Sequence, residues 1–186
     1  MVSQGLFSTS GSATATLPQR LDQFSERYHD YFPRLFAYIY GRVHNVHIAE
    51  DLVADVFERA FVKADTLRNE DAFSTWLFTI ARNIIISNGR KRARESIVDP
   101  DILKEIAPSG TSVESEVMNR EDLDQVAELL HGFPQREQDV IALKFDAELP
   151  NAQIAKIMNL SEANVRVILF RTLRKLRDQM AAQARR

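Results

Sequence analysis

The C-terminal end of the chain carries the pattern that most restricts its fold: a short apolar helix, a tight turn and a longer basic helix between Leu149 and Asp178. Asn159 suits the left-handed backbone of a turn, and Ser161 is a good N-cap for the helix that follows. The first helix holds Gln153, Ile154, Ala155, Ile157 and Met158, and the second, from about Glu162, holds Val165, Leu169, Thr172 and Leu176. This spacing predicts a helix-turn-helix, whose second helix enters the major groove of DNA. An ordinary helical hairpin with basic solvent-facing sides is the alternative.

Charge is segregated along the chain, although the formal net charge is only −2. The stretch from Arg82 to Arg94 holds five basic residues and no acidic one, and the stretch from Arg166 to Arg186 holds seven basic residues and one acidic one. Between Glu95 and Glu128 there are ten acidic residues and two basic ones. The distribution of charge says more about partners than its sum, so the two basic segments predict two contacts with nucleic acid. Solvated helix faces are the simpler alternative for either segment alone.

Three amphipathic helices are predicted before the acidic segment. The first spans Leu17 to Val43, and Pro33 either kinks it or starts a new helix. The second begins near Asn45 or His47, and the third runs from about Asp71 to Arg94. The buried stripe of the third helix is predicted to consist of Phe73, Trp76, Leu77, Ile80, Ala81 and Ile84. Off that stripe we expect Arg82, Asn83, Ser87 and Arg90.

The acidic segment is rich in Pro, Gly, Ser and Thr, which is typical of a linker. A helix is expected from Asn119 to His131, and Pro134 opens the next one at a favoured first-turn position. The sequence therefore predicts an all-α fold of two small helical domains joined by a flexible acidic linker, with the helix-turn-helix in the second. We expect a disordered leader over residues 1–17, domains over 18–94 and 119–186, and the linker over 95–118.

Several classes of protein are disfavoured by what the chain lacks. It has no cysteine, which excludes disulfides and thiolate metal sites and fits a reducing cytoplasm. No apolar run approaches the ~20 residues of a membrane span. Its histidines are scattered and no Gly-rich phosphate loop is present, so no catalytic set, metal site or cofactor is expected. No further domain is expected after Arg186.

Three segments in order resemble the extracytoplasmic-function (ECF) sigma factors of bacterial RNA polymerase. They are AEDLVADVFERAF, then FSTWLFTIARN with RKRAR, then LPNAQIAKIMNLSEANVRVILFRTLRKLR, and the likeness runs from about Leu21 to Met180. The resemblance implies a first domain that melts the promoter and a second that binds the minus-thirty-five element as duplex. It implies a transcription initiation subunit with no enzymatic activity of its own, acting in the cytoplasm.

The resemblance also implies roles for particular residues. Contacts with the minus-ten element are expected from Asn69, Glu70, Asp71, Arg82, Asn83, Arg90, Lys91, Arg92 and Arg94. Contacts with the minus-thirty-five element are expected from Gln153, Ser161, Asn164, Arg166, Val167, Arg171, Arg174 and Lys175. Docking on the clamp helices of the polymerase β′ subunit is expected from Asp51, Leu52, Asp55 and Phe57. The outer apolar surface of the second domain would dock on the β flap, and an anti-sigma factor is a possible further partner.

One departure from the family pattern affects promoter choice. Many members have Gly-Thr-Val-Lys-Ser-Arg after the serine, whereas this chain has Ala163, Asn164, Val165, Arg166, Val167 and Ile168. An apolar pair replaces polar residues near the start of the recognition helix, which favours recognition of DNA shape.

Two other functions are alternatives to the sigma factor. A self-standing regulator with a LuxR-like helix-turn-helix would carry a receiver or ligand pocket in its first domain, which the RKRAR helix fits poorly. An adaptor that binds polymerase without contacting DNA does not explain the two basic helices.

Overall fold

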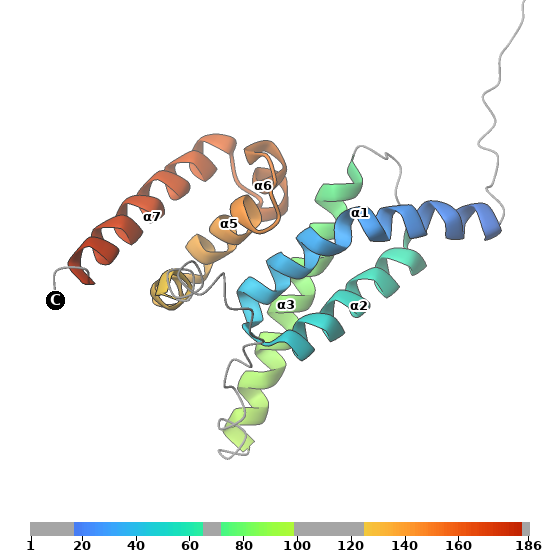
Figure 1. Ribbon diagram of the computed structural model, residues 1–186, viewed down its shortest axis with the longest axis horizontal. Coiled ribbons are helices and arrows are strands. Elements are labelled where there is room, and N and C mark those ends of the chain that lie inside the picture. The colour runs from blue at the N-terminus through green and yellow to red at the C-terminus, as the bar shows by residue number, and fades with distance from the viewer. Residues whose placement is uncertain (1–16, 65–71, 99–124, 184–186) are drawn as a thin grey trace, which may run out of the picture.

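The computed structural model describes residues 17–64, 72–98 and 125–183, and the side chains of residues 17–23 and 95–98 are left aside. Within these ranges the chain is helical and contains no strand. The first group of helices is α1 (Leu17–Val43), α2 (Val46–Val62) and α3 (Phe73–Val98). The second is α5 (Gln135–Phe145), α6 (Asn151–Met158) and α7 (Glu162–Gln183), preceded by a helical segment over 125–131. Figure 1 shows the two groups side by side, with α5 next to α1. Among the described residues, no helix has the length and apolar character needed to cross a membrane.

The junction between α1 and α2 follows the capping rules closely. His44 has a positive φ of 51°, and the Asn45 side chain accepts a hydrogen bond of 3.0 Å from the amide of Ile48. Asn45, and not His47, is therefore the N-cap of α2. Helix α1 continues through Pro33, which is exposed, so the alternative of a second helix that starts after Tyr31 is wrong.

Helix α3 is longer than expected and ends at Val98, four residues beyond the predicted end at Arg94. The sequence offers a physical reason, because Pro100 disfavours a helical conformation for the residue before it, whereas nothing in residues 95–98 breaks a helix. Gly89 lies inside this helix and is exposed. The first four residues of the expected linker thus belong to α3.

The core of the first group lies between α1, α2 and α3. Its fully buried side chains include Tyr38, Leu35, Ile39, Leu77 and Phe78. The predicted stripe of α3 is confirmed for Phe73, Leu77, Ala81 and Ile84, while Trp76 and Ile80 are only partly buried. In the second group the core side chains include Val140, Leu143, Leu149, Ile154 and Val165.

The two groups of helices form one continuous apolar cluster. Helix α3 contacts α6, and α1 contacts α5. Arg34 of α1 donates hydrogen bonds of 2.9 and 2.6 Å to the carbonyl oxygen of Ala147, which follows α5. The sequence left the relative placement of the two domains open, and the structure has them in direct contact.

Candidate nucleic-acid and polymerase interfaces

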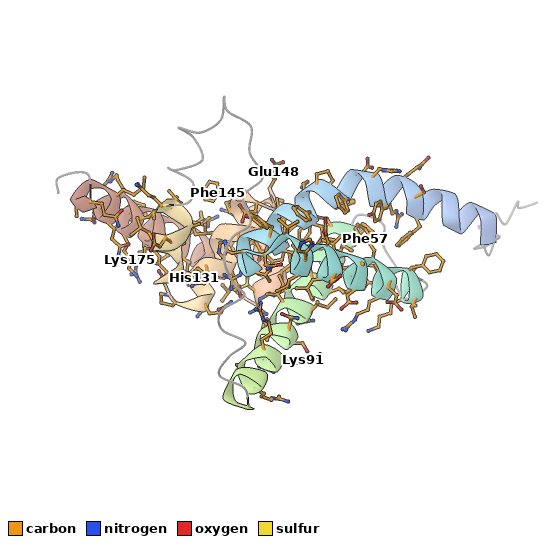
Figure 2. The ribbon with its side chains drawn as sticks, turned by 60° about the horizontal axis from the view of Figure 1, so that its bottom comes forward. Phe57, Lys91, His131, Phe145, Glu148 and Lys175 are labelled. Atoms are coloured by element: carbon orange, nitrogen blue, oxygen red, sulfur yellow. The ribbon has the colours of Figure 1, made fainter. Side chains whose placement is uncertain are left out.

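The end of α3 beyond its buried stripe carries a row of polar and basic side chains. Asn83, Arg90 and Arg94 are exposed, and their spacing of seven and four residues puts them on one face of the helix. Lys91 is also exposed, and Arg92 is half-buried. Figure 2 shows Lys91 on the part of α3 that extends away from the other helices. This part of the helix presents positive charge to solvent, and the sequence from Arg82 to Arg94 contains no acidic residue.

Arg82 lies in a different environment from the rest of this set. Its side chain is 27% exposed, and its Nε donates a hydrogen bond of 3.2 Å to Oδ2 of Asp139 on α5. The sequence predicted Arg82 to be off the buried stripe, and it is, but it points to the other group of helices. Asn69, Glu70 and Asp71 lie outside the described residues.

The helix-turn-helix has the predicted turn. Asn159 adopts a left-handed conformation with φ 53° and ψ 54°, and the amide of Leu160 donates a 2.8 Å hydrogen bond to the carbonyl of Ala155. Ser161 Oγ accepts a 3.2 Å hydrogen bond from the amide of Asn164, as an N-cap should. Ile154, Ala155 and Ile157 of α6 and Val165 and Leu169 of α7 are buried, and Leu160 in the turn is partly buried.

The outer face of α7 is exposed along its length. The exposed candidate residues are Ser161, Asn164, Arg166, Val167, Arg171, Arg174 and Lys175. Arg166 Nη1 lies 3.7 Å from Glu162 Oε2, and Lys175 Nζ lies 3.0 Å from Glu137 Oε1. Gln153 differs from the others because it is half-buried and its Oε1 accepts a 3.2 Å hydrogen bond from Ser74 Oγ of α3.

The four candidate polymerase-binding residues of α2 divide into two pairs. Asp51 and Asp55 are exposed and lie one turn apart on the same face. Leu52 and Phe57 are each only 4% exposed and belong to the core between α1 and α2. Phe57, for example, contacts the rings of Phe24 and Tyr28. The structure therefore leaves the two carboxylates available for a partner and the two apolar side chains engaged inside.

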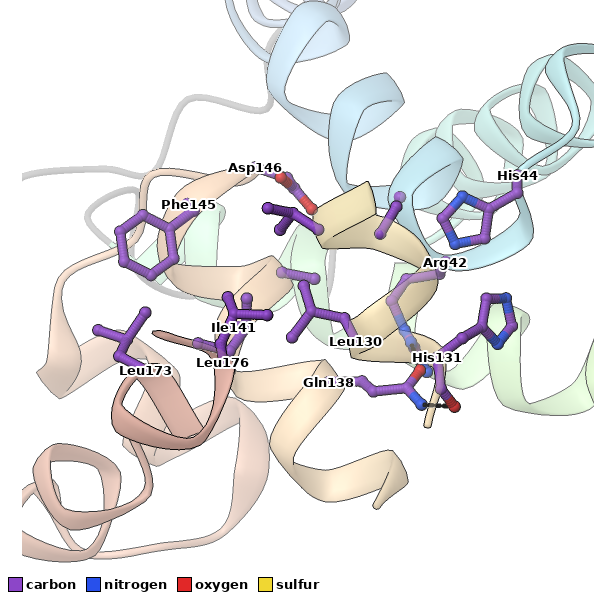
Figure 3. Close-up of a pocket in the computed structure, with 14 residues that line it drawn as sticks. Arg42, His44, Leu130, His131, Gln138, Ile141, Phe145, Asp146, Leu173 and Leu176 are labelled. Carbon is purple, nitrogen blue, oxygen red and sulfur yellow. Dashed lines mark hydrogen bonds between the residues drawn. The ribbon is translucent and has the colours of Figure 1, made fainter. Parts of the chain in front are cut away.

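An apolar pocket of about 330 Å³ lies where α1, α5, α7 and the segment 125–131 meet (Figure 3). Arg42, His44, His131 and Asp146 are the titratable groups on its wall, and Leu130, Ile141 and Leu176 are among its apolar ones. Burial raises the pKa of Asp146 to about 6, against the opposing effect of Arg42. No pattern in the sequence indicates this pocket, because its walls come from segments far apart in the chain.

A buried cluster of charged side chains was also not predicted from the sequence. Arg42 Nη2 of α1 lies 3.1 Å from Asp139 Oδ1, and both side chains are nearly inaccessible. Tyr38 is fully buried beside them, its hydroxyl has no hydrogen-bond partner among the described residues, and burial raises the pKa of this phenol well above its usual range. The amphipathic pattern of α5 could have indicated that Asp139, next to Val140, is buried. It could not have indicated which basic residues pair with the Asp139 carboxylate.

Comparison with known proteins identifies the two groups of helices. Residues 27–95 match the family model Sigma-70 region 2, and residues 129–178 match Sigma-70, region 4. The ECF RNA polymerase sigma factor SigW of Bacillus subtilis is 28% identical over 86% of this chain and 89% of its own length. The ECF RNA polymerase sigma-E factor of Escherichia coli is 32% identical over 72% of this chain and 76% of its own length.

Two solved structures share the fold. The sigma factor RpoE of Bartonella quintana, solved with the anti-sigma factor NepR, superposes with a TM-score of 0.69 at 23% identity, over 86% of this chain and 98% of that one. CnrH in complex with the cytosolic domain of CnrY gives a TM-score of 0.65 at 18% identity, over 87% of this chain and 90% of that one. Both sigma-70 regions are matched, and the Escherichia coli ECF sigma factor is 32% identical with 76% of its length covered, so this chain belongs to the ECF family of RNA polymerase sigma factors, and its function is promoter recognition in transcription initiation.

Proposed function

We propose that the exposed end of α3 holds the minus-ten promoter element, and the observation that carries this proposal is its row of outward basic side chains. Asn83, Arg90 and Arg94 share one face, and Lys91 and Arg92 lie beside it. Guanidinium and ammonium groups neutralise phosphates and release counterions, which supplies affinity independent of sequence. Opening follows if unpaired bases are captured next to this helix, because capture of a flipped base draws the duplex toward the melted state.

The outer face of α7 is proposed to bind the minus-thirty-five element as duplex. Ser161 and Asn164 stand at the start of this helix, where a recognition helix contacts base edges. Farther along, Arg171 and Arg174 are exposed and at a suitable position for phosphates. Val167 is 44% exposed and offers an apolar contact, such as one with a thymine methyl group.

Two surfaces are proposed for core polymerase. Asp51 and Asp55 present paired carboxylates on the outside of α2, and we assign them to the clamp helices of β′. Phe145, Phe170 and Leu173 are 54%, 68% and 40% exposed, which is unusual for large apolar side chains, and we assign them to the β flap. In this role the protein acts in the cytoplasm and catalyses no reaction of its own.

An anti-sigma factor is a further proposed partner. The Bartonella quintana protein of similar fold was solved with one. In this chain, an inhibitor that lies over α3 and α7 together would cover both proposed DNA surfaces.

The test is reconstitution with purified bacterial core polymerase on fragmented DNA from the source organism, followed by sequencing of RNA 5′ ends. We expect β and β′ to bind the tagged chain and the new start sites to share two upstream elements. Polymerase binding without specific starts would indicate an adaptor, and duplex binding without polymerase would indicate a self-standing regulator. Replacing Asn164 by Ala should then change the preferred upstream element and leave the downstream one unchanged.

A further inference from the structure

One carboxylate joins three helices from both domains. Oδ1 of Asp139 on α5 forms an ion pair with Nη2 of Arg42 on α1 at 3.1 Å, and Oδ2 accepts a hydrogen bond of 3.2 Å from Nε of Arg82 on α3. Gln135 Nε2 donates a further hydrogen bond of 3.2 Å to Oδ1. The side chains of Asp139 and Arg42 are 3% and 6% exposed, so this is a desolvated cluster in which both carboxylate oxygens are bonded.

Around the cluster, further polar contacts join the two domains beside their continuous apolar core. Arg34 donates to the carbonyl of Ala147, and Ser74 donates to Gln153 across the α3–α6 contact. Interfaces between domains of one chain resemble those of transient complexes, and a buried ion pair adds little net stability over well-packed apolar side chains. Such an interface fixes one arrangement of the domains and still permits them to separate.

Two residues with proposed DNA contacts are engaged in this interface. Arg82 belongs to the α3 set and is bonded to Asp139, and Gln153 belongs to the helix-turn-helix and is bonded to Ser74. A guanidinium held by a buried carboxylate must leave it before it binds a phosphate. The phosphate backbone and Asp139 therefore compete for the same cation.

We infer that Asp139 is an internal latch: it holds the free chain in a closed form in which Arg82 is withheld from promoter DNA. Opening exchanges the Asp139 carboxylate for a DNA phosphate at Arg82. The effect on DNA binding rests on the proposed function of α3. The closed form itself does not, because it is defined by the distance between the two domains.

The distance is measured first, in the free full-length protein. The chain has no native cysteine, so single cysteines in place of the exposed Glu58 of α2 and Gln179 of α7 accept spin labels for pulsed electron resonance. The labelled protein with Asp139 intact should give one narrow distribution of distances between the labels. The Asp139→Asn variant should give a broader distribution with longer distances. Glu128→Gln is the matched control, because it removes an exposed carboxylate of the second domain.

A second variant keeps the test independent of the folding of α5. Arg42→Gln removes the Asp139 ion pair from the α1 side, together with the hydrogen bond that Arg42 donates to Gln138, and substitutes no residue of the second domain. Circular dichroism establishes that each variant is folded. If both Asp139→Asn and Arg42→Gln are folded and keep the narrow distribution, the latch is disproved.

Binding to a fluorescent single-stranded DNA oligonucleotide of random sequence is measured next. If the closed form is populated about nine times in ten, Asp139→Asn should bind about tenfold more tightly, and Glu128→Gln should bind like the parent. Longer distances without tighter binding, in a chain that does bind DNA, would overturn the competition at Arg82. If no variant binds DNA, the proposed function of α3 has failed, and the latch stands or falls on the distances alone.

Discussion

Gly41 and Asp146 approach so closely that a Cβ on the glycine would lie 2.6 Å from Oδ2 of the aspartate. Gly41 is near the end of α1, and Asp146 is the C-cap of α5. Glycine has a low helix propensity, so by itself it would only weaken the end of α1. In the structure it is the point where the two domains come together without a side chain between them, close to the Asp139 latch.

Gly41→Ala and Gly89→Ala should therefore have opposite effects, although both add a methyl group to a helix. Around Gly89 no atom lies within 4 Å of the added Cβ, so alanine should stabilise α3 by about 1 kcal/mol. Gly41→Ala gains the same helix propensity but pushes Asp146 aside. Hydrogen exchange by mass spectrometry should show faster exchange at the end of α5 in Gly41→Ala and slower exchange in α3 in Gly89→Ala. Wild-type exchange at the end of α5 in Gly41→Ala would contradict the close approach.

The pKa of Asp146 gives stability a defined pH dependence. This carboxyl has a pKa of about 6 in the folded chain and an ordinary value of 3.8, so the folded state binds more protons between these values. Its contribution to the free energy of unfolding therefore increases as pH falls through about 6 toward about 4, by at most about 3 kcal/mol. Urea unfolding of the parent and of Asp146→Asn across this range should show the difference. All other titratable groups are common to both proteins, and parallel pH profiles would rule out the effect.

The turn of the helix-turn-helix depends on the left-handed backbone of Asn159. Glycine tolerates φ 53° without strain, whereas alanine in this region costs about 1–2 kcal/mol. Asn159→Gly should therefore unfold at nearly the same urea concentration as the parent, and Asn159→Ala at a lower one. Equal midpoints for the two variants would show that the second domain does not depend on this conformation.

Local features of the fold could be predicted because their causes are local. The Asn159 turn and the Ser161 cap follow from the preferences of single residues, and the apolar stripe of α3 follows from its helical period. Even so, sequence reasoning ended α3 too early, because the change of composition after Arg94 looked like the end of a helix. The patterns of charge and hydrophobicity are sufficient to predict the helices and the division into domains.

The interface between the domains could not be predicted in this way. Arg82 and Asp139 are 57 residues apart, and Arg34 and Ala147 are 113 apart. In the sequence, Arg82 is one more basic residue in a basic segment. Only the fold distinguishes Arg82 from Arg90, because it places the buried carboxylate of Asp139 within hydrogen-bond distance of Arg82.

The clamp-docking role of α2 predicts a selective loss of polymerase binding. Asp51→Arg with Asp55→Arg should weaken binding to core polymerase by at least about tenfold, because two attractive charges become repulsive. Both side chains are exposed, so the thermal stability of the protein should hardly change. Glu26→Arg on α1, another exposed carboxylate, is the matched control. Undiminished affinity, measured by fluorescence anisotropy, would exclude this face of α2 from the polymerase interface.

The basic end of α3 predicts a defect in promoter opening that leaves polymerase binding intact. Substitution of Arg90, Lys91 and Arg92 by Glu should abolish open complexes, because the new carboxylates would repel the DNA phosphates. Open complexes are detected by the permanganate reactivity of unpaired thymines. For single changes, Arg90→Glu should weaken binding to single-stranded DNA more than Arg136→Glu on α5, which changes the net charge equally.

The salt dependence separates phosphate binding from a general effect of charge. Removal of one side chain that neutralises a phosphate should reduce the slope of log K against log salt by about 0.7 for a single strand. Arg90→Ala should therefore lower the slope by about that amount, and Arg136→Ala should leave it unchanged. If both variants lower the slope equally, the binding reflects net charge and α3 does not bind the strand. If only Arg90→Ala does so, while β and β′ still bind, the end of α3 binds the DNA and polymerase docking lies elsewhere on the chain.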